Sequence, residues 1–493
     1  MPKSTMPQIK KIIFLMLENR SLDNLLGWVY QGSRPLTVFP KGSSPQFDGL
    51  VEGKFSLPYS SSVSYPVIPI PDKYIGERVP AWDPYEEMYT AWSWNGVMNQ
   101  LFGNQNMIGG MPGSGTSPTM KGFYQDYYSM AQGEWEGMDI TWTYRGGLPI
   151  MSLLAKAYGV SDAWFCSVPT QTNPNRAYSL IGTSQGRENN LHYSAVETYV
   201  GETIFNALGK AGKSWGLYYT DLWQSPAKDQ PKQCFTQYTF PNLTGAPNGE
   251  IATHDTFFQR LVDGSLPDFT YLEPKWGYGT DAYYVQGTDY HPPTNVMPGE
   301  AFLYQVFLTL AKSPQWDETL FIVTFDEHGG TYDHVAPPWG AINPDGIRGS
   351  YGFNFDLFGA RVPTMLISPF VYPGSVFRAP ANSAYPFDHT SFIKTLLGWA
   401  GADIPATTFG KRMPAAPTFD TFLADHPVNF GGLTSFQMPA MAETDPKDLT
   451  ALFAGMGFAA VRDILHRDKT LEEIQADIAR YRADPEGFEE TLR

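Results

Sequence analysis

The sequence predicts an α/β fold built on a mostly parallel β-sheet flanked by helices. Short apolar runs bounded by polar or turn residues alternate with segments of helical periodicity, and this alternation favours parallel strand pairing. Continuous apolar runs are typical of strands that are buried on both faces. The chain has 493 residues, of which 42% are hydrophobic and 15% aromatic. This apolar content supports a large core and excludes disorder over most of the length.

Five apolar runs are the expected buried strands, and four segments with apolar residues on one face are the expected helices. The strands are residues 12–17, 215–219, 269–272, 320–325 and 362–368. The helices are residues 177–181, 203–211, 299–312 and 391–400. Gly212 and Pro314 follow the second and third of these helices and are typical stop signals.

Two long segments and one change of composition define the expected domain organisation. Residues 32–83 and 103–147 are rich in Pro, Gly, Ser and aromatic residues, and we expect these long loops to wall a crevice at the carboxyl ends of the strands. After Pro439 the sequence becomes dense in charge and helical in period. We predict one main domain over residues 1–438 and a small helical appendage over residues 439–493. The appendage either packs on the core or acts as an amphipathic membrane-sensing or lid element.

Charge, hydropathy and cysteine content exclude several classes of protein. The 34 Lys and Arg against 50 Asp and Glu give a net charge of −16, which argues against binding to nucleic acid or electrostatic adhesion to anionic lipid. We predict no transmembrane segment. The apolar run at residues 12–17 predicts a strand rather than a signal peptide, because it is short and lacks a cleavage site. Localisation stays undetermined, and Cys166 and Cys234 allow either one disulfide or two free thiols.

A pair of polar residues with at least one carboxylate comes directly after each of two predicted strands, and we call these the acidic pairs. Glu18 and Asn19 follow residues 12–17, and Asp326 and Glu327 follow residues 320–325. Adjacent carboxylates at the buried end of a strand repel each other, and a cation relieves that repulsion. Carboxylate and amide oxygens suit a hard divalent ion. On its own, the pair Glu18 and Asn19 is more typical of a solvated helix cap.

A third cluster lies between Pro169 and the helix expected at residues 177–181. A hydroxyl at the start of a helix is most often an N-cap, and this is the first interpretation of Thr172. The second is that Thr172 is a nucleophile activated by a bound metal, while helix amides, Asn175 and Arg176 hold phosphoryl oxygens.

Three histidines complete the candidate site. His291 and His389 each have an aspartate nearby that could fix the tautomer or raise the basicity of the ring, and His334 follows the second acidic pair in the same loop. Each histidine alone is as typical of a structural role as of a catalytic one. Together with the acidic pairs and Thr172, they describe metal-assisted phosphoryl transfer through a covalent enzyme intermediate, with His291 as the proton donor to the leaving alkoxide.

These motifs resemble those of a known family. Residues 17–28, LENRSLDNLLGW, are similar to the ENRSFDHMLGW-type signature of the bacterial phospholipase C and acid phosphatase phosphoesterase family. The stretch TNPNR with the later GTS resembles its T-x-PNR…GTS segment, and SPQW followed by FDEHGGTYDHV resembles its SPQW…YDEHGGFYDHV segment. RVPT at 361–364 and DHTS at 388–391 follow in family order. The resemblance covers residues 9–399 and looks closest to the plant non-specific phospholipases C.

The resemblance implies an alkaline-phosphatase-like core and makes the main domain a phosphoesterase catalytic domain. It implies that a divalent metal, Ca²⁺ or Zn²⁺, is held by oxygen ligands from Glu18, Asn19, Thr172, Asp326 and Glu327. Thr172 would also be the nucleophile that becomes phosphorylated. His291 would protonate the leaving alcohol, and His334 and His389 would line the site.

Two residues of the first motif depart from the family signature. Leu22 and Asn24 replace its usual phenylalanine and histidine. Neither is a proposed ligand, but both changes can reshape the surroundings of the metal. The substrate preference is therefore left open.

The expected function is that of a phospholipase C, a phosphoric ester hydrolase. The substrate would be a phosphatidylcholine-like glycerophospholipid at a membrane or micelle surface, cleaved to diacylglycerol and a phosphorylated head group through a phosphothreonine intermediate. The alternatives are an acid phosphatase that acts on small phosphomonoesters and an inactive lipid-binding or toxin module. A set of aromatic residues favours lipid, although they are equally suited to loop packing: Tyr59, Tyr65, Tyr74, Trp82, Tyr85, Tyr89 and Trp92. The oligomeric state is not predicted.

Overall fold

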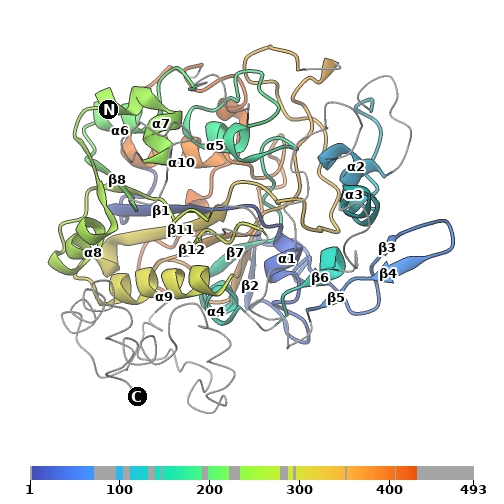
Figure 1. Cartoon of the computed structure of the whole chain (residues 1–493). Helices are drawn as coiled ribbons and strands as arrows, with labels where there is room; N and C mark the ends of the chain where they lie inside the picture. The colour runs from blue at the N-terminus through green and yellow to red at the C-terminus, as the bar shows by residue number, and fades with distance from the viewer. Residues whose placement is uncertain are drawn as a thin grey trace, which may run out of the picture.

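A nine-stranded mixed β-sheet forms the centre of the protein in a computed structural model (Figure 1). Its strand order is β2-β13-β7-β12-β11-β1-β10-β8-β9. The structure describes residues 3–70, 96–103, 112–130, 139–145, 148–190, 198–220, 234–277, 287–292, 296–349, 352–405 and 407–429. The helical appendage predicted at residues 439–493, its boundary and five of the aromatic residues expected to favour lipid lie outside this part of the chain.

Most neighbouring strands of the sheet run in parallel, as predicted. In sheet order the strands are Thr37–Phe39 (β2), Ser375–Phe377 (β13), Gly159–Ser161 (β7), Thr364–Ile367 (β12), Thr319–Phe325 (β11), Lys11–Leu17 (β1), Phe269–Leu272 (β10), Trp215–Tyr219 (β8) and Gly249–Thr253 (β9). Only β12 is antiparallel to its two neighbours. All five predicted strands are present. The two central ones, β1 and β11, are almost wholly buried because helices cover both faces.

Two layers of helices sandwich the sheet (Figure 1). On one face Pro149–Ala157 (α4) and His254–Asp263 (α8) pack against Met297–Lys312 (α9). On the other face Thr172–Leu180 (α5) and Ile204–Lys210 (α6) pack against Thr390–Ala400 (α10). The remaining helices are Leu22–Leu26 (α1), Val97–Phe102 (α2), Phe123–Met130 (α3) and Phe235–Thr239 (α7), with short 3₁₀ helices at Asp139–Thr141, Pro241–Gly245, Trp316–Glu318, Met413–Ala415 and Asp420–Phe422.

The segments expected to be long loops contain regular structure. The first holds β2, the β3–β4 hairpin of Ser56–Pro58 and Ser64–Pro66, and Ile68–Pro69 (β5), which pairs with Trp142–Thr143 (β6) in the second. These strands were not predicted, because strands of two or three residues that contain proline and serine show too little apolar alternation to be recognised in the sequence. Within the described chain no helix has both the length and the apolar character needed to cross a bilayer. Cys166 and Cys234 are both free and buried.

Candidate active site

The two predicted acidic pairs lie side by side at the carboxyl edge of the sheet. In the parallel pairing of β1 with β11, Leu17 lies opposite Phe325. The chains that leave these strands stay in contact, because the amide of Asn19 donates to Asp326 Oδ1 at 3.2 Å. Glu18 is 7% exposed and Asp326 is fully buried.

The backbone of Asn19 is held in a strained conformation. Its φ of +59° lies in the left-handed region, which costs free energy for any residue other than glycine and often marks a functional site. Gly329, itself at φ +60°, lies against it, and a Cβ added at Gly329 would come 2.0 Å from the Asn19 carbonyl oxygen. Glycine at 329 therefore permits the close approach of the two loops.

Thr172 faces this pair of loops from the start of α5. The structure rejects the interpretation of Thr172 as an N-cap, because Gln171 is the N-cap residue and Thr172 is already in the first turn. The predicted helix at residues 177–181 thus begins five residues earlier than expected. The Thr172 hydroxyl donates to Asn19 Oδ1 at 3.3 Å, so the predicted nucleophile touches a predicted metal ligand.

Arg176 provides the counter-charge for the buried carboxylates. Its Nε donates to Asp326 Oδ2 at 2.9 Å, and Nη2 lies 3.5 Å from Glu18 Oε1. Burial raises the pKa of Glu18 to about 8, and the neighbouring Asp326 adds to the rise, while Arg176 and His291 oppose it. The site therefore concentrates more negative charge than one guanidinium stabilises.

The oxygen donors at this edge fit a divalent ion. Glu18, Asn19, Thr172 and Asp326 supply carboxylate, amide and hydroxyl oxygens, which hard cations prefer. Asp326 already accepts from the Asn19 amide through Oδ1 and from Arg176 through Oδ2. Glu327 is also bonded to the protein, because its Oε2 accepts from the Gly329 amide at 2.6 Å and lies 3.3 Å from His328 Nδ1. Its role as a ligand stays a prediction.

Asn175 and Arg176 contact the protein rather than the space beside Thr172. The Asn175 amide bonds to the backbone of Val168, Thr170 and Gln171, and so fixes the loop that leads into α5. The Arg176 guanidinium also donates to the carbonyls of Met16 and Leu17. These contacts favour positioning roles and give no support to the phosphoryl contacts predicted for the two side chains.

His389 lies beneath the second acidic pair as a neutral ring. Its Nδ1 accepts from Trp164 Nε1 at 3.4 Å, so Nε2 carries the proton and donates to the Asp326 carbonyl at 2.6 Å. Burial lowers its pKa to about 4, with a smaller contribution from Arg176 in the same direction. His389 thus supports the backbone of Asp326. The aspartate expected to fix its tautomer, Asp388, bonds to other groups.

His291 lies close to both acidic pairs. Its charge opposes the rise that burial causes in the pKa of Glu18 and of Asp326. The Glu18 amide donates to the Asp289 carbonyl at 2.8 Å, which attaches the His291 loop to the end of β1. Asp289 accepts from the backbone amide of His291 at 3.3 Å, and the His291 ring bonds to the Pro292 carbonyl through Nδ1 at 2.5 Å.

Tyr290 and Glu300, which the sequence analysis missed, hold this loop in place. Tyr290 has a φ of +72°, its carbonyl accepts from Arg20 Nε at 2.8 Å, and its hydroxyl donates to Glu300 Oε1 at 2.7 Å. Burial raises the pKa of Glu300 to about 7, although this bond and two amides of α4 oppose the rise. The spacing of residues along the chain does not reveal that Tyr290 has a left-handed backbone conformation or that Glu300 is buried next to the His291 loop.

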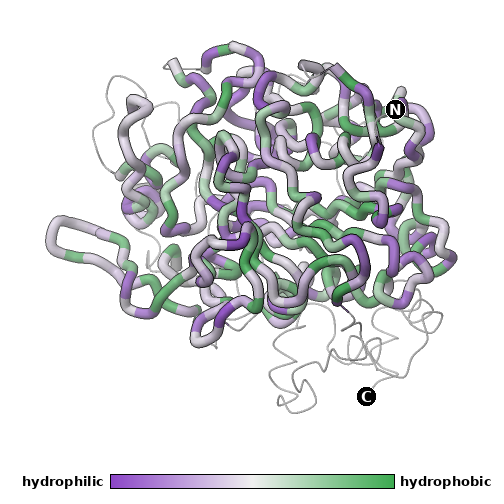
Figure 2. Tube along the Cα trace, turned by 180° about the vertical axis from the view of Figure 1, so that it is seen from behind, coloured by the Kyte–Doolittle hydropathy of each residue, from purple (hydrophilic) through white to green (hydrophobic). Residues whose placement is uncertain are grey.

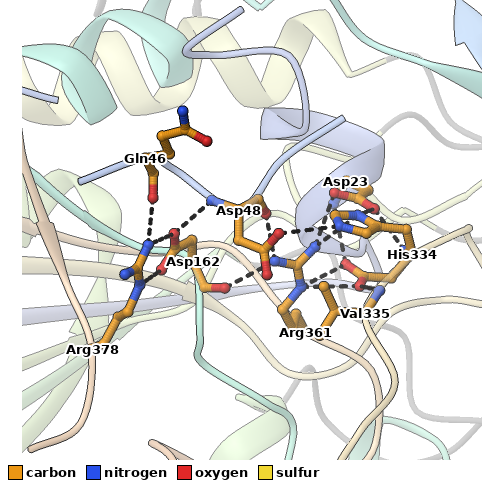
Figure 3. Close-up of polar contacts among 9 residues, drawn as sticks. Asp23, Gln46, Asp48, Asp162, His334, Val335, Arg361 and Arg378 are labelled. Atoms are coloured by element: carbon orange, nitrogen blue, oxygen red, sulfur yellow. Dashed lines mark hydrogen bonds and ion pairs between the residues drawn. The ribbon is translucent and has the colours of Figure 1, made fainter. Parts of the chain in front are cut away.

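A second buried cluster surrounds His334 (Figure 3). His334 Nδ1 bonds to Asp23 Oδ2 at 2.6 Å, and Arg361 lies 3.0 Å from both Asp23 and Asp333. Among the described residues, Asp23, Asp333 and His334 are the one group of three histidine, cysteine or acidic side chains with ligand atoms within 4.8 Å of one another. The guanidinium of Arg361 contacts both carboxylates, and a protonated His334 supplies the second positive charge that balances them.

The sequence analysis identified His334 but not its partners. Asp333 and Arg361 lie inside the motifs YDHV and RVPT, and Asp23 lies inside the first motif. The three residues were therefore part of recognised motifs, but nothing in their spacing along the chain indicates that they contact His334. The three predicted carboxylates Glu18, Asp326 and Glu327 do not form a similarly tight group, because Arg176 holds Asp326 and the Gly329 amide holds Glu327.

We predict that His334 makes stability depend on pH. Burial alone would lower its pKa, but hydrogen bonds to Asp23 and Asp48 outweigh that effect and raise the pKa from 6.5 to about 9. Its contribution is therefore complete below pH 6.5 and is lost as the pH rises through 9. The free energy of unfolding of the wild type should exceed that of His334→Gln by up to about 3 kcal/mol more at acidic than at alkaline pH.

Urea denaturation of both proteins at several pH values measures this difference. A gap between the two proteins that stays constant from about pH 6 to about pH 10 would show that folding does not change the pKa of His334.

Comparison with known proteins assigns this chain to a family. The model of the Phosphoesterase family matches residues 9–398. Non-specific phospholipase C1 of Arabidopsis thaliana is 33% identical over 404 residues, which cover 80% of this chain and 67% of that protein. Phospholipase C B of Mycobacterium tuberculosis is 27% identical over 471 residues, which cover 85% and 79%. A crystal structure of a protein in the alkaline phosphatase superfamily from Vibrio parahaemolyticus has a TM-score of 0.32 at 15% identity, over 56% of this chain and 65% of that one.

The resemblance that the motifs indicated is thereby confirmed, because the family match spans the four sequence segments that meet at the site. The chain belongs to the Phosphoesterase family and is a phosphoric ester hydrolase.

Proposed function

We propose that this phosphoesterase is a metal-dependent phospholipase C that hydrolyses phosphatidylcholine-like glycerophospholipids to diacylglycerol and a phosphorylated head group. The single observation that carries the chemistry is the contact of the Thr172 hydroxyl with Asn19, next to Glu18 and Asp326. The substrate class is supported by the relatives named phospholipase C.

The residues act in a fixed order in this proposal. Thr172 Oγ, whose proton passes to solvent, attacks phosphorus and displaces diacylglycerol. The P–O bond to the glycerol breaks, and the head-group phosphate is left esterified to Thr172. His291 gives its proton to the departing alkoxide. Water then attacks phosphorus and breaks the bond to Thr172 Oγ, which takes a proton from that water. This step releases the phosphorylated head group and restores the hydroxyl, and His291 regains its proton from solvent.

Two features of the site favour the attack by Thr172. The residue is in the first turn of α5, where backbone amides and the helix dipole attract a phosphoryl anion. Glu18, Asn19, Thr172 and Asp326, with Glu327 as the further predicted ligand, would hold the divalent ion, which when bound supplies charge stabilisation and lowers the pKa of the hydroxyl.

Thr172→Ala should lower the turnover of phosphatidylcholine by about three orders of magnitude, because no other group in the site replaces the nucleophile. Thr172→Ser is the matched control and should keep a large part of the activity. Mass spectrometry of acid-quenched wild type should find a phosphorylcholine group on Thr172 when phosphatidylcholine is the substrate. Near-normal turnover by Thr172→Ala contradicts the covalent mechanism.

Removal of metal should abolish hydrolysis without unfolding the protein. The carboxylates at the site are buried next to each other, so a chelator should lower activity to background, and Ca²⁺ or Zn²⁺ added singly should identify the ion that restores it. Full activity of a preparation shown by elemental analysis to contain no divalent metal would remove the metal from the mechanism.

Tyr290→Phe should affect substrates according to their leaving group. Loss of the bond to Glu300 releases the loop that carries His291, so turnover of phosphatidylcholine, which needs a proton donor, should fall about tenfold. Turnover of p-nitrophenylphosphorylcholine, whose leaving group needs none, should change less than about twofold. Tyr158→Phe, a buried tyrosine that follows α4, is the control. Equal losses on both substrates would show that Tyr290 does not act through His291.

These two diesters and the monoester p-nitrophenyl phosphate separate a phospholipase from a phosphatase. An enzyme that hydrolyses p-nitrophenyl phosphate but neither phosphatidylcholine nor p-nitrophenylphosphorylcholine is an acid phosphatase, which was the alternative from the sequence. A metal-loaded protein without turnover on any of these esters would be an inactive module, and both outcomes overturn the proposal.

A further inference from the structure

The β3–β4 hairpin projects from the body of the protein (Figures 1 and 2). Its tip is a tight loop in which the amides of Tyr59 and Ser60 both donate to the Val63 carbonyl, at 2.8 and 3.1 Å. Tyr59 is 36% exposed and Val63 is 40% exposed, and Tyr128 of the adjacent α3 is 38% exposed. We refer to these three side chains as the tip patch.

The tip patch is held in place by a stack of tyrosine rings. The ring of Tyr59 lies 5.0 Å from that of Tyr128 and 5.6 Å from that of Tyr124, both edge to face. Tyr65, on the opposite strand, stacks on Tyr124 at 4.6 Å. Gln125 donates from Nε2 to the Tyr59 carbonyl at 3.2 Å. The exposed rings are therefore ordered before any partner binds, which reduces the entropic cost of binding.

The hairpin carries no charge in a strongly acidic protein. Residues 56–71 contain no Asp, Glu, Lys, Arg or His, whereas the whole chain has a net charge of −16. A surface that enters the polar head groups of a lipid layer must avoid desolvating charges, and tyrosine is favoured there because it joins an apolar ring to a hydroxyl. The composition thus suits a zwitterionic lipid surface, to which electrostatic attraction contributes little.

The base of the hairpin contacts the loops of the active site. Phe55, directly before β3, lies 4.5 Å from the His334 ring. Phe123 at the start of α3 lies 5.4 Å from the Tyr332 ring and 6.1 Å from the His328 ring, both in the loop that follows β11. Figure 1 shows the hairpin and α3 on the side of the sheet where α1 follows β1. The tip patch and the catalytic loops therefore belong to one side of the molecule.

We infer that the tip patch is the docking site for a phosphatidylcholine surface and that it brings the active site to its lipid substrate. The inference rests on the proposed function for the identity of the surface. Docking here depends on apolar and aromatic contact, so binding should be insensitive to salt, unlike adhesion through a basic patch.

Paired variants test the docking site without touching the active site. Tyr59→Ser with Val63→Ser should lower the partition of the protein onto phosphatidylcholine vesicles about tenfold, measured by sedimentation. Leu36→Ser with Val200→Ser is the matched control, because these side chains are 77% and 61% exposed elsewhere on the surface, and it should bind like the wild type. A third variant, Tyr59→Phe, keeps the ring and should keep most of the binding. The wild type and the three variants should hydrolyse the soluble ester p-nitrophenylphosphorylcholine at equal rates.

A fluorescent label measures insertion directly. Cys166 and Cys234 are buried, so a cysteine introduced by Val63→Cys can be labelled selectively with an environment-sensitive dye. Its emission should shift to shorter wavelength on addition of vesicles at low and at high salt, and the same dye at Val200→Cys should not shift. Vesicle binding with no shift at position 63, or unchanged partition of the double serine variant, overturns the inference.

The outcomes separate this inference from the proposed function. An emission shift in the labelled Val63→Cys protein, together with a wild type that hydrolyses no phosphodiester, supports docking and refutes the phospholipase. A wild type that hydrolyses the soluble ester, together with no shift in the labelled Val63→Cys protein, refutes docking alone. A change from dimer to monomer in the serine variant, seen by light scattering without vesicles, would identify the tip patch as a contact between two copies and also overturn the inference.

Discussion

The parallel pairing of β1 with β11 is the constraint on which the active site depends. Because Leu17 lies opposite Phe325, Glu18 and Asp326 leave the sheet at the same edge and meet at once. A shift of one residue in this register would turn every side chain of the strand to the opposite face. All seven residues of β11 and six of the seven in β1 are buried, so a shifted register would force side chains of different shape into close-packed layers on both faces of the sheet.

Buried arginines fix the loops that this pairing brings together. Arg176 binds Asp326 and lies near Glu18, and Arg361 binds Asp23 and Asp333. Buried ion pairs add little net stability because desolvation offsets their attraction, but loss of one partner is costly since it leaves a bare charge. In this protein they hold acidic groups close together that would otherwise repel one another, which is the arrangement that a phosphoryl-transfer site requires.

The small elements beyond the sheet connect the site to the surface. Gln100 of α2 bonds to His328 Nε2 at 2.8 Å and to Asp126 of α3 at 3.0 Å. Asp126 is fully buried and also accepts from the Gly96 amide at 2.7 Å. Polar bonds thus run from the loop after β11 through α2 to α3, which supports the β3–β4 hairpin.

Sequence reasoning was most successful where local patterns are strong. Buried runs predicted all five strands, because a strand covered on both faces is continuously apolar. The polar pairs at the ends of β1 and β11 were also predicted, because each pair follows directly after a continuous apolar run. Histidine partners were predicted less well: Asp388 is adjacent to His389 in the sequence but bonds to other groups, and the His389 ring binds the Asp326 carbonyl instead.

Local composition and contiguous motifs are sufficient to predict the α/β class, the phosphoesterase family and the residues that gather at the carboxyl edge of the sheet. Three-dimensional contacts were needed to place Thr172 in the first turn of α5, to pair Arg176 and Arg361 with buried acids, and to show that Glu300 supports the His291 loop through Tyr290. These contacts join residues far apart in the chain, and their partners are chosen by packing and burial, which no local pattern records.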